Sequence, residues 1–540
     1  MSKAQAADVA SGQRIVTKAE ERRVIIASSV GTVFEWYDFY LYAILAPFFA
    51  GLFFPPGNQT AALLGAFGAY AAGFLVRPFG ALIFGRVGDL VGRKYTFLVT
   101  IVVMGLATVF VGFLPTYASI GFMAPAILVT LRLAQGLALG GEYGGAATYV
   151  AEHAPDEKRG YATSWIQTTA TVGMLVALMI IGLCRLGLEA KSFSEWGWRI
   201  PFWLSIPLLM ISIYIRLKLQ ESPIFQRMKS QGKRSKQPLI DSFFTYPNNK
   251  FVAIALLGAT AGQGVVWYTG QFYALFFLQI YLKLDFIPTY ILIGLSLILA
   301  TPFFLVFGAL SDRIGRKKII LAGCLIAAVT YFPLFKGLTH YVNPALERYQ
   351  QTTPIHVDAS DCNFHIFIGP WSRQTACDKA KDFLGKAGLS FDSAPGDPGQ
   401  DLITHIGNIE LKGWDEAKYK EALKATGYPL KADLAQVNWV MTELILFIMV
   451  IYVTMVYGPI AAFLVELFPA RIRYTSMSLP YHIGNGWFGG MLPLLATAMV
   501  ASSGHIYQGL WYPIVVSVMT VLIGVPLVHE TRHIRIHEEH

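Results

Sequence analysis

Long apolar stretches alternate with short polar ones along almost the whole chain. A membrane-spanning helix needs about 20 mainly apolar residues, and twelve stretches are long enough to serve as one. They form two groups of six on either side of a polar segment at 219–248. The pattern predicts an all-α membrane protein with twelve transmembrane helices in two six-helix bundles. The stretches are 24–52, 60–84, 95–114, 120–150, 161–184, 200–217, 250–281, 287–310, 318–337, 438–467, 475–500 and 506–528.

One long polar segment, residues 339–437, interrupts the second group between the ninth and tenth stretches. It includes RQTACDKAKDFLGKAG and KGWDEAKYKEALKATGYP, which have the composition of a soluble domain. The ninth helix is expected to begin at the cytoplasmic side and to end opposite it, which places this insert outside the cytoplasm. Cys362 and Cys377 would then lie in an oxidising compartment, where we predict a disulfide between them; two free thiols are the alternative.

The sequence of the loop between the second and third stretches is repeated in the second half of the chain. GRVGDLVGRK begins at Gly85 and GALSDRIGRK begins at Gly308. Five of the ten positions are identical, and each identical pair is 223 residues apart. Repetition in register predicts a duplication, so the two bundles should be pseudo-symmetric. The glycines would let helix ends approach closely, while the Arg and Lys side chains stay at the cytoplasmic side.

Composition and charge indicate a membrane protein rather than a soluble one. Of the 540 residues, 54% are hydrophobic and only 14% are charged. The formal charge of +9 does not predict nucleic-acid binding, because Lys and Arg gather on alternate loops while the loops at 53–59, 115–119 and 501–505 carry none. The positive-inside rule then places both termini in the cytoplasm and the chain in the inner or plasma membrane. The expected segments are a tail at 1–23, the N-terminal bundle at 24–218, a cytoplasmic linker at 219–248, helices 7–9 at 249–338, the insert at 339–437, helices 10–12 at 438–530 and a tail at 531–540.

Two carboxylates lie near the middle of the first predicted helix. Glu35 and Asp38 are roughly 17 and 21 Å from its cytoplasmic start, at about 1.5 Å per residue. They share one helical face with Tyr42. Ionisable groups at that depth are costly unless they pair or line a cavity. They form either a structural ion pair inside the bundle or a proton or substrate site.

Two arginines and a third carboxylate lie in the neighbouring helices. Arg77, in the second stretch, is a plausible partner for Glu35 or Asp38. In the fourth stretch, Arg132 and Glu142 fall on one stripe with Gln135, among glycines that allow close helix approach. We therefore expect a cluster of buried charges in the first bundle.

The G-x-x-x-D-x-x-G-R-K loops resemble the signature loops of the major facilitator superfamily. FEWYDFYLYA, RPFGALIFGRVGD, RLAQGLALGGEYGGA and LQESPIF together resemble its metabolite:proton symporter family, whose members carry alpha-ketoglutarate, citrate, shikimate, or proline and betaine. The resemblance covers nearly the whole chain outside 340–436. It implies that the signature aspartates and arginines brace one bundle against the other in the outward-facing state. The signature-loop residues are Gly85, Asp89, Arg93, Gly308, Asp312 and Arg316.

Polar residues also follow helical faces in the second bundle. Gln263, Trp267 and Gln271 recur every four residues, and His482 shares a face with Asn485. We expect them to face a central cavity; for any single one, packing or a helix–helix hydrogen bond is the alternative. The predicted substrate-binding residues are Tyr42, Arg77, Arg132, Gln135, Gln263, Trp267, Gln271, Tyr457, His482 and Asn485.

No catalytic, nucleotide-binding or metal motif is present in the sequence, so we expect no enzyme and no cofactor. Our leading hypothesis is proton symport of a small organic carboxylate by a monomer in the lipid bilayer. Protonating an acid would free an arginine to bind the anion, with Asp38 as the first candidate proton carrier, then Glu35 and Glu142. The alternatives are uptake of a zwitterionic osmolyte, proton-driven efflux, and a membrane sensor or scaffold that binds a partner through the insert.

Overall fold

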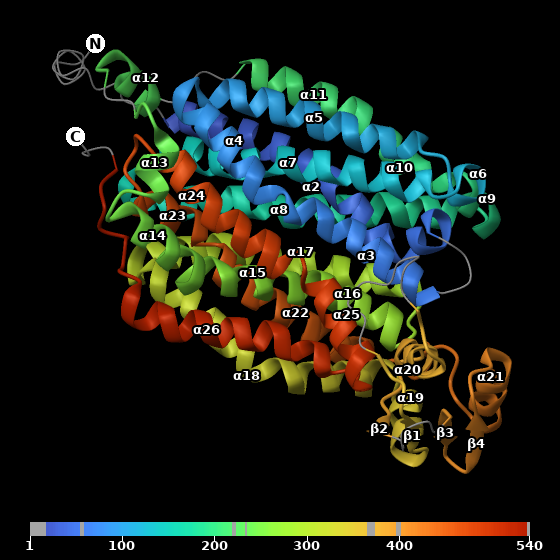
Figure 1. Cartoon of the computed structure of the whole chain (residues 1–540). Coiled ribbons are helices and arrows are strands. Elements are labelled where there is room, and N and C mark those ends of the chain that lie inside the picture. Colours follow the sequence, from blue (N-terminus) through green and yellow to red (C-terminus); the bar gives the residue numbers. More distant parts are fainter. Residues whose placement is uncertain are drawn as a thin grey trace.

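The computed structural model describes residues 18–54, 59–218, 223–232, 235–363, 373–395 and 401–536. Within these ranges, twelve helical stretches are long and apolar enough to cross a membrane. Six precede the linker and six follow it, as the apolar pattern predicts. Figure 1 shows the two halves packed along each other, the N-terminal half in blue to green and the C-terminal half in light green to red. The predicted tails at 1–23 and 531–540 lie partly outside the described residues.

The N-terminal half is built from long helices joined by short turns. Its second span breaks after Leu75 and resumes at Arg77, where Pro78 occupies the first turn and leaves a backbone acceptor without its usual N–H donor. The elements of this half are α2 (Lys18–Phe53), α3 (Gln59–Leu75), α4 (Arg77–Leu90), α5 (Arg93–Phe113), α6 (Tyr117–Ile120), α7 (Met123–Ala151), η1 (Asp156–Lys158), α8 (Arg159–Gly187), α9 (Ala190–Glu195), η2 (Gly197–Arg199), α10 (Ile200–Trp203) and α11 (Ser205–Lys218).

The C-terminal half differs because π-helical turns interrupt two of its spans. Three such turns (η3, η4 and η5) lie in the seventh span and one (η6) in the eleventh, and such turns often mark functional sites. The linker and this half contain α12 (Pro223–Ser230), α13 (Pro238–Phe243), α14 (Asn248–Ala255), η3 (Leu256–Thr260), α15 (Ala261–Tyr268), η4 (Thr269–Tyr273), α16 (Ala274–Phe276), η5 (Phe277–Tyr281), α17 (Phe286–Ile314), α18 (Arg316–Val342), α22 (Trp439–Tyr457), α23 (Ile460–Leu467), α24 (Arg473–His482), η6 (Ile483–Gly489), α25 (Leu492–Ser503), η7 (Gln508–Leu510) and α26 (Trp511–Leu527).

Both signature loops are tight turns between two spans. Gly92 separates α4 from α5 with φ 145°, and Gly315 separates α17 from α18 with φ 111°. Side chains other than glycine rarely adopt these backbone conformations, which explains why the repeat keeps a glycine at both positions. We call the end of the membrane part that holds both loops the signature end, and the opposite end the insert end.

The insert is a small mixed domain rather than a helical one. Its elements are α19 (Pro344–Thr352), β1 (Ile355–Ala359), α20 (Ala376–Lys386), β2 (Asp392–Pro395), β3 (Ile403–Ile406), β4 (Ile409–Lys412) and α21 (Glu416–Ala425). The sheet order is β2-β1-β3-β4, with β1 parallel to β2 and the other pairings antiparallel. The all-α fold class therefore holds for the membrane part only. The ninth helix also continues to Val342, past its predicted end at 338.

Cys362 and Cys377 are joined by a disulfide, with their Cα atoms 5.2 Å apart. The bond ties the segment after β1 to the first turn of α20. Replacing both by serine is expected to destabilise the insert by about 3 kcal/mol, because the crosslink closes a loop with a sequence separation of 15. Limited proteolysis of the full-length protein in detergent measures this. Reductant should speed cleavage of the insert in the wild type but not in the double variant, and a Cys324→Ser variant should behave as the wild type does. Equal cleavage rates with and without reductant would contradict the prediction.

Candidate functional site

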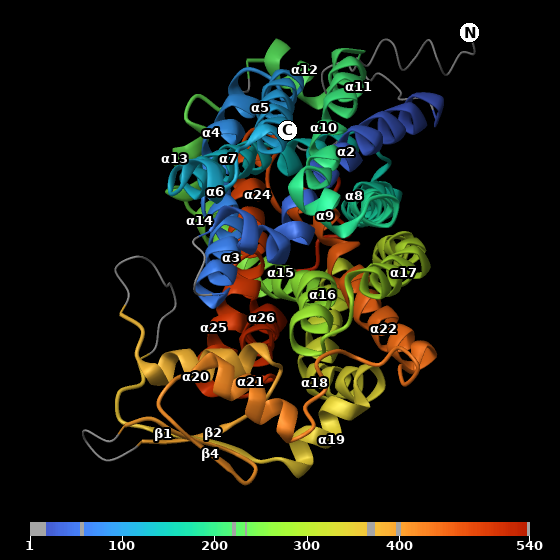
Figure 2. The ribbon, with the colours of Figure 1, turned by 90° about the vertical axis from the view of Figure 1, so that its right-hand side faces the viewer.

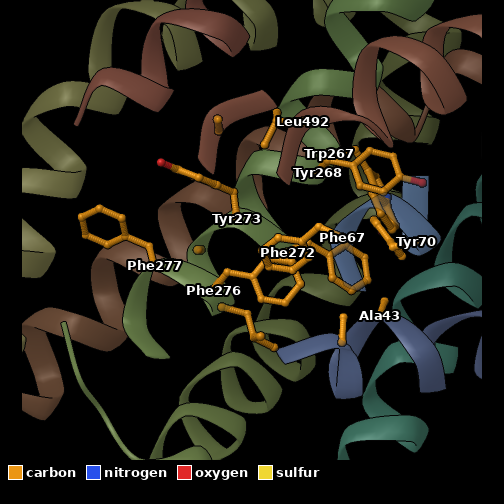
Figure 3. Close-up of a cluster of buried hydrophobic side chains, with 14 of the residues drawn as sticks. Ala43, Phe67, Tyr70, Trp267, Tyr268, Phe272, Tyr273, Phe276, Phe277 and Leu492 are labelled. Carbon is orange, nitrogen blue, oxygen red and sulfur yellow. The ribbon is translucent and has the colours of Figure 1, made fainter. Parts of the chain in front are cut away.

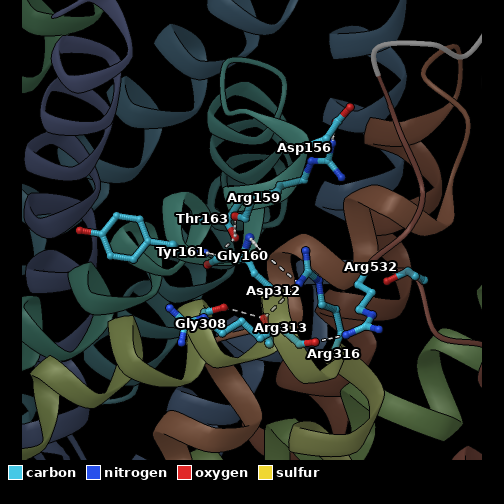
Figure 4. A network of polar contacts seen from close by, with 12 residues as sticks. Asp156, Arg159, Gly160, Tyr161, Thr163, Gly308, Asp312, Arg313, Arg316 and Arg532 are labelled. Carbon is cyan, nitrogen blue, oxygen red and sulfur yellow. Dashed lines mark hydrogen bonds and ion pairs between the residues drawn. The ribbon is translucent and has the colours of Figure 1, made fainter. Parts of the chain in front are cut away.

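The signature aspartates of the two loops reach across to helices of the opposite half. Asp312 accepts from the backbone N–H groups of Gly160 (2.8 Å) and Tyr161 (2.9 Å), in the first turn of α8 (Figure 4). Asp89 accepts from the backbone N–H (3.0 Å) and hydroxyl (2.7 Å) of Thr475, in the first turn of α24. A carboxylate is stabilised at a helix N-terminus, where N–H groups lack intrahelical partners. Each signature aspartate thus holds a helix of the other half.

Buried ion pairs at the signature end also connect the two halves. Arg159 of the N-terminal half pairs with Glu466 of the C-terminal half at 2.9 Å. Arg473 of the C-terminal half pairs with Glu152 of the N-terminal half at 3.2 Å. Arg316 contributes a second cation to Glu466 at 2.9 Å and pairs with its own signature aspartate at 2.8 Å. These contacts close the signature end.

Two signature glycines lie where the backbones of the halves touch. A Cβ atom on Gly85 would lie 3.1 Å from the Cα atom of Thr475. One on Gly308 would lie 2.7 Å from the carbonyl oxygen of Gly160. Any larger residue would push the halves apart at these points. The side chain of Arg93 lies outside the part of the chain that the structure describes.

Three helices of the N-terminal half bring together two carboxylates and one guanidinium. Arg216 of α11 donates through Nη2 to Glu35 of α2 and to Glu142 of α7. Thr100 donates to the other oxygen of Glu142 at 3.3 Å. The prediction that Arg77 pairs with Glu35 or Asp38 is wrong, because Arg216, which is only 5% exposed, pairs with Glu35 instead.

Asp38, one turn beyond Glu35, has a different environment. Its Oδ1 accepts from the Ser205 hydroxyl at 2.5 Å, and no cation of the described residues lies within ion-pair distance of it. A buried carboxylate without a cation is costly when ionised, and a bound proton removes that cost. Its neighbour on the same face, Tyr42, donates to the carbonyl oxygen of Ala66 at 2.9 Å.

Arg77 and Arg132 lie against aromatic rings instead of carboxylates. The Cζ atom of Arg132 is 4.5 Å from the ring centre of Tyr42 and 4.7 Å from that of Phe39. The Cζ atom of Arg77 is 4.4 Å from the same Phe39 ring and 4.0 Å from the ring of Phe74. Throughout the described ranges, no carboxylate lies within ion-pair distance of either arginine. Phe39 therefore separates two buried cations that lack anions.

The donors of these two arginines are only partly used. Arg132 donates through Nη1 to Gln135 at 2.5 Å, and Gln135 donates to Thr108 at 2.8 Å. Nε and Nη2 of both Arg132 and Arg77 are buried and have no hydrogen-bond partner among the residues described. Leaving such charged donors unpaired costs free energy, which an anion bound to them would recover.

Three of the predicted binding residues in the C-terminal half are occupied by helix–helix contacts. Gln263 and Asn485 exchange two amide hydrogen bonds, both 2.9 Å long. The hydroxyl of Tyr457 lies 2.7 Å from that of Tyr481. For these residues, the structure shows the alternative that the sequence analysis left open.

The other three predicted binding residues, Trp267, Gln271 and His482, have buried polar atoms without a partner among the described residues. The indole nitrogen of Trp267, both amide atoms of Gln271 and both ring nitrogens of His482 are buried without a hydrogen-bond partner within the described ranges. The ring of Trp267 packs on Tyr40 (6.0 Å between centroids) and Trp36 (6.2 Å) of the first helix. Figure 3 shows Trp267 in an aromatic cluster that draws on both halves. These three groups and the two arginines form the candidate binding site.

Arg77 itself contacts the C-terminal half. A Cβ atom on Gly486 of η6 would lie 3.7 Å from both Cβ and Cδ of Arg77. His482 immediately precedes η6. The aliphatic part of the Arg77 side chain thus lies against the π-helical turn that follows His482. A ligand at this place would contact both halves at once.

Two family descriptions match this chain: "Sugar (and other) transporter" over residues 24–242 and "MFS/sugar transport protein" over residues 145–341. The shikimate transporter of Escherichia coli (strain K12) is 35% identical over 325 residues, 59% of this chain and 72% of that protein. The inner membrane metabolite transport protein YhjE of the same strain is 30% identical over 525 residues, 95% of this chain and 94% of that protein.

Among solved structures, the proton:xylose symporter XylE from E. coli has the same fold. Its TM-score is 0.62, and the alignment covers 95% of this chain and 96% of that chain. The sequence identity is only 14%, so this likeness concerns the fold alone.

Proposed function

The chain belongs to the major facilitator superfamily of membrane transporters, and we propose that it takes up a small organic carboxylate together with protons. The observation that carries the proposal is the pair of buried, uncompensated guanidinium groups of Arg77 and Arg132. Planar guanidinium donors suit a carboxylate better than a neutral sugar, because two parallel N–H groups can bind its two oxygens. The relatives support a metabolite of this class, since one of them is named for shikimate.

Proton coupling is proposed to use the carboxylates of the same half. Glu35 and Glu142 share the single positive charge of Arg216, so the group has one negative charge in excess when both are ionised. Binding one proton removes that excess. Asp38 offers a second place for a proton, because a serine hydroxyl is its only hydrogen-bond partner in the described part of the chain.

Transport is proposed to follow alternating access of the two halves around this site. The signature-end contacts hold the halves together on one side, through Asp89 and Asp312. Opening toward that side must break both aspartate contacts and the buried ion pairs beside them. The candidate site lies between the halves, where such rocking would expose it to each side in turn.

A zwitterionic osmolyte remains a second candidate because of one specific observation. Trp36 and Trp267 both stack on Tyr40, and Phe272 lies 5.3 Å from the same ring. A cluster of aromatic faces can hold a quaternary amine by cation–π attraction. In such a substrate, the carboxylate would bind the arginines and the amine would bind the rings.

Uptake by proteoliposomes under an imposed pH gradient tests the proposal. The protein is reconstituted and supplied separately with labelled shikimate, alpha-ketoglutarate, citrate, proline and betaine. We expect saturable uptake of one carboxylate that collapses when a protonophore removes the gradient. Uptake of betaine or proline alone would favour the second candidate, and uptake of neutral sugars alone would overturn both.

The orientation in the membrane is proposed from the basic loops, with the linker in the cytoplasm and the insert outside. A cysteine placed at exposed Lys420 of the insert should react with an impermeant maleimide added to intact cells. One placed at exposed Lys236 of the linker should react only after the cells are permeabilised. The reverse pattern would invert the orientation.

A further inference from the structure

We propose that the insert is a lid over the insert end: it is fastened to the C-terminal half and must leave the N-terminal half whenever the transporter opens on that side. This inference rests on the alternating access of the proposed function, but not on the identity of the substrate. It also assigns a role to the one part of the chain that the membrane fold does not require.

Backbone hydrogen bonds fasten the insert to two loops of the C-terminal half. The N–H of Phe391 donates to the carbonyl of Gly504 at 2.8 Å, in the loop before α26. The N–H of Ala432 donates to the carbonyl of Lys283 at 3.1 Å, in the loop between the seventh and eighth spans. In the same loop, Asp285 pairs with Lys431 at 3.0 Å.

The turn after α20 rests directly on the end of the seventh span. Gly388 adopts φ 72°, and a Cβ atom placed there would overlap the carbonyl oxygen of Tyr281. Gly504 is equally tight, because a Cβ atom on it would overlap Phe391. Close approach of this kind leaves no room for sliding, so the insert should move with the C-terminal half as one body.

The same helix of the insert also reaches the N-terminal half. Helix α20 lies against α3, as well as against α25 and η5 of the C-terminal half. Figures 1 and 2 both show α20 at the insert end, beside α25 and α3. Direct contacts between the halves lie close by, including the rings of Phe67 and Phe276 at 4.9 Å (Figure 3). The insert therefore adds a second layer to the closed insert end.

The contact between α20 and α3 exists only while the insert end is closed. Rocking of the halves separates α3 from the C-terminal half, and the fastened insert must move away with its own half. Interactions made in one state only shift the equilibrium toward that state. Loosening the insert should therefore populate the state that is open at the insert end.

The test measures opening as the reactivity of one buried cysteine in the full-length protein. Ala43, beside the aromatic cluster of Figure 3, is replaced by cysteine in a background with Cys184→Ser and Cys324→Ser. A small impermeant methanethiosulfonate is added to intact cells, and no substrate is needed. Gly388→Ala should raise the labelling rate about tenfold, which corresponds to about 1.4 kcal/mol.

The insert supplies a matched control for the backbone strain that Gly388→Ala introduces. Gly427 has φ 83°, and no atom of the described residues lies within 4 Å of a Cβ atom placed on it. Gly427→Ala therefore carries similar strain within the insert without touching the membrane part. Its labelling rate should equal that of the parent.

A charge reversal tests the fastening without altering the backbone. Lys431→Glu places a carboxylate beside Asp285. The control, Lys420→Glu, places a carboxylate beside Glu416 within the insert, where the native ion pair is 2.6 Å long. Only the first should speed labelling, and adding Asp285→Lys should restore the slow rate. Unchanged or slower labelling in both Gly388→Ala and Lys431→Glu would overturn the lid. Failure to transport any carboxylate would instead overturn the proposed substrate. The labelling rates would still test the lid, because the assay uses no substrate.

Discussion

Replacing Arg132 by glutamine is expected to raise the dissociation constant of the proposed carboxylate substrate by at least about 100-fold, or about 2.8 kcal/mol. The guanidinium is fully buried, its Nε and Nη2 have no partner among the described residues, and its plane is held by Tyr42 and Phe39. Hydrogen bonds from a charged donor contribute about 1.5–3 kcal/mol each, and glutamine removes two of them together with the charge. Arg77→Gln should act in the same direction.

Calorimetric titration of the purified variants, with the carboxylate that the wild type takes up best, measures this loss. Arg132→Lys should recover only part of the affinity, because an ammonium group cannot offer two parallel donors. Lys191→Gln is the control, since it removes one positive charge from an exposed site in the same half. Unchanged affinity in both arginine variants, with normal melting curves, would place the anion site elsewhere.

The spans, the duplication and the signature turns could be predicted because each depends on local sequence. Apolar length decides whether a segment crosses a membrane, and the repeat at Gly85 and Gly308 identifies the two halves without any tertiary information. Glycines such as Gly92 and Gly315 follow from the backbone conformation that a tight turn requires. The relatives at 30–35% identity confirm the family that these motifs predicted.

The role of Arg216 could not be predicted from the sequence around it. In the sequence it stands at the border between an apolar stretch and a basic run, as a cytoplasmic arginine would. Its role depends on which helix packs beside α2, and Glu35 is 181 residues away along the chain. One local signal was available: two carboxylates predicted at mid-membrane depth require a buried cation, and α11 has an arginine in its last turn, inside the apolar stretch.

Side-chain pairing and the fold of the insert could not be predicted from local sequence either. Gln263 and Asn485 looked like cavity residues, yet they bind each other across two helices. The strands of the insert have only four or five residues each, too few to reveal an alternating pattern. Their sheet forms through pairings between distant segments, which composition does not encode.

Neutralising the coupling acid is expected to abolish accumulation driven by a pH gradient while substrate exchange remains measurable. Asp38 is the first candidate, because its carboxylate is buried and, among the described residues, forms a hydrogen bond only with the Ser205 hydroxyl. Glu35 and Glu142 follow, since Arg216 can neutralise only one of them at a time. An amide at the coupling position cannot take up or release a proton, so the carrier can still exchange substrate but gains no energy from the gradient.

Asp38→Asn, Glu35→Gln and Glu142→Gln are compared in proteoliposomes under a gradient of about one pH unit, which can drive at most about tenfold accumulation per proton. Glu443→Gln is the matched control, because Glu443 is also a membrane-embedded carboxylate that accepts from a serine, Ser296, at 2.9 Å, but lies in the other half. Whichever of the three variants removes the coupling acid should still exchange labelled for unlabelled substrate. Its internal substrate concentration should reach only the value found without a gradient, whereas Glu443→Gln should accumulate substrate as the wild type does. If all three acid variants still concentrate substrate against its gradient, protons do not couple through this cluster, and the proposed mechanism is wrong even though the fold and the family stand.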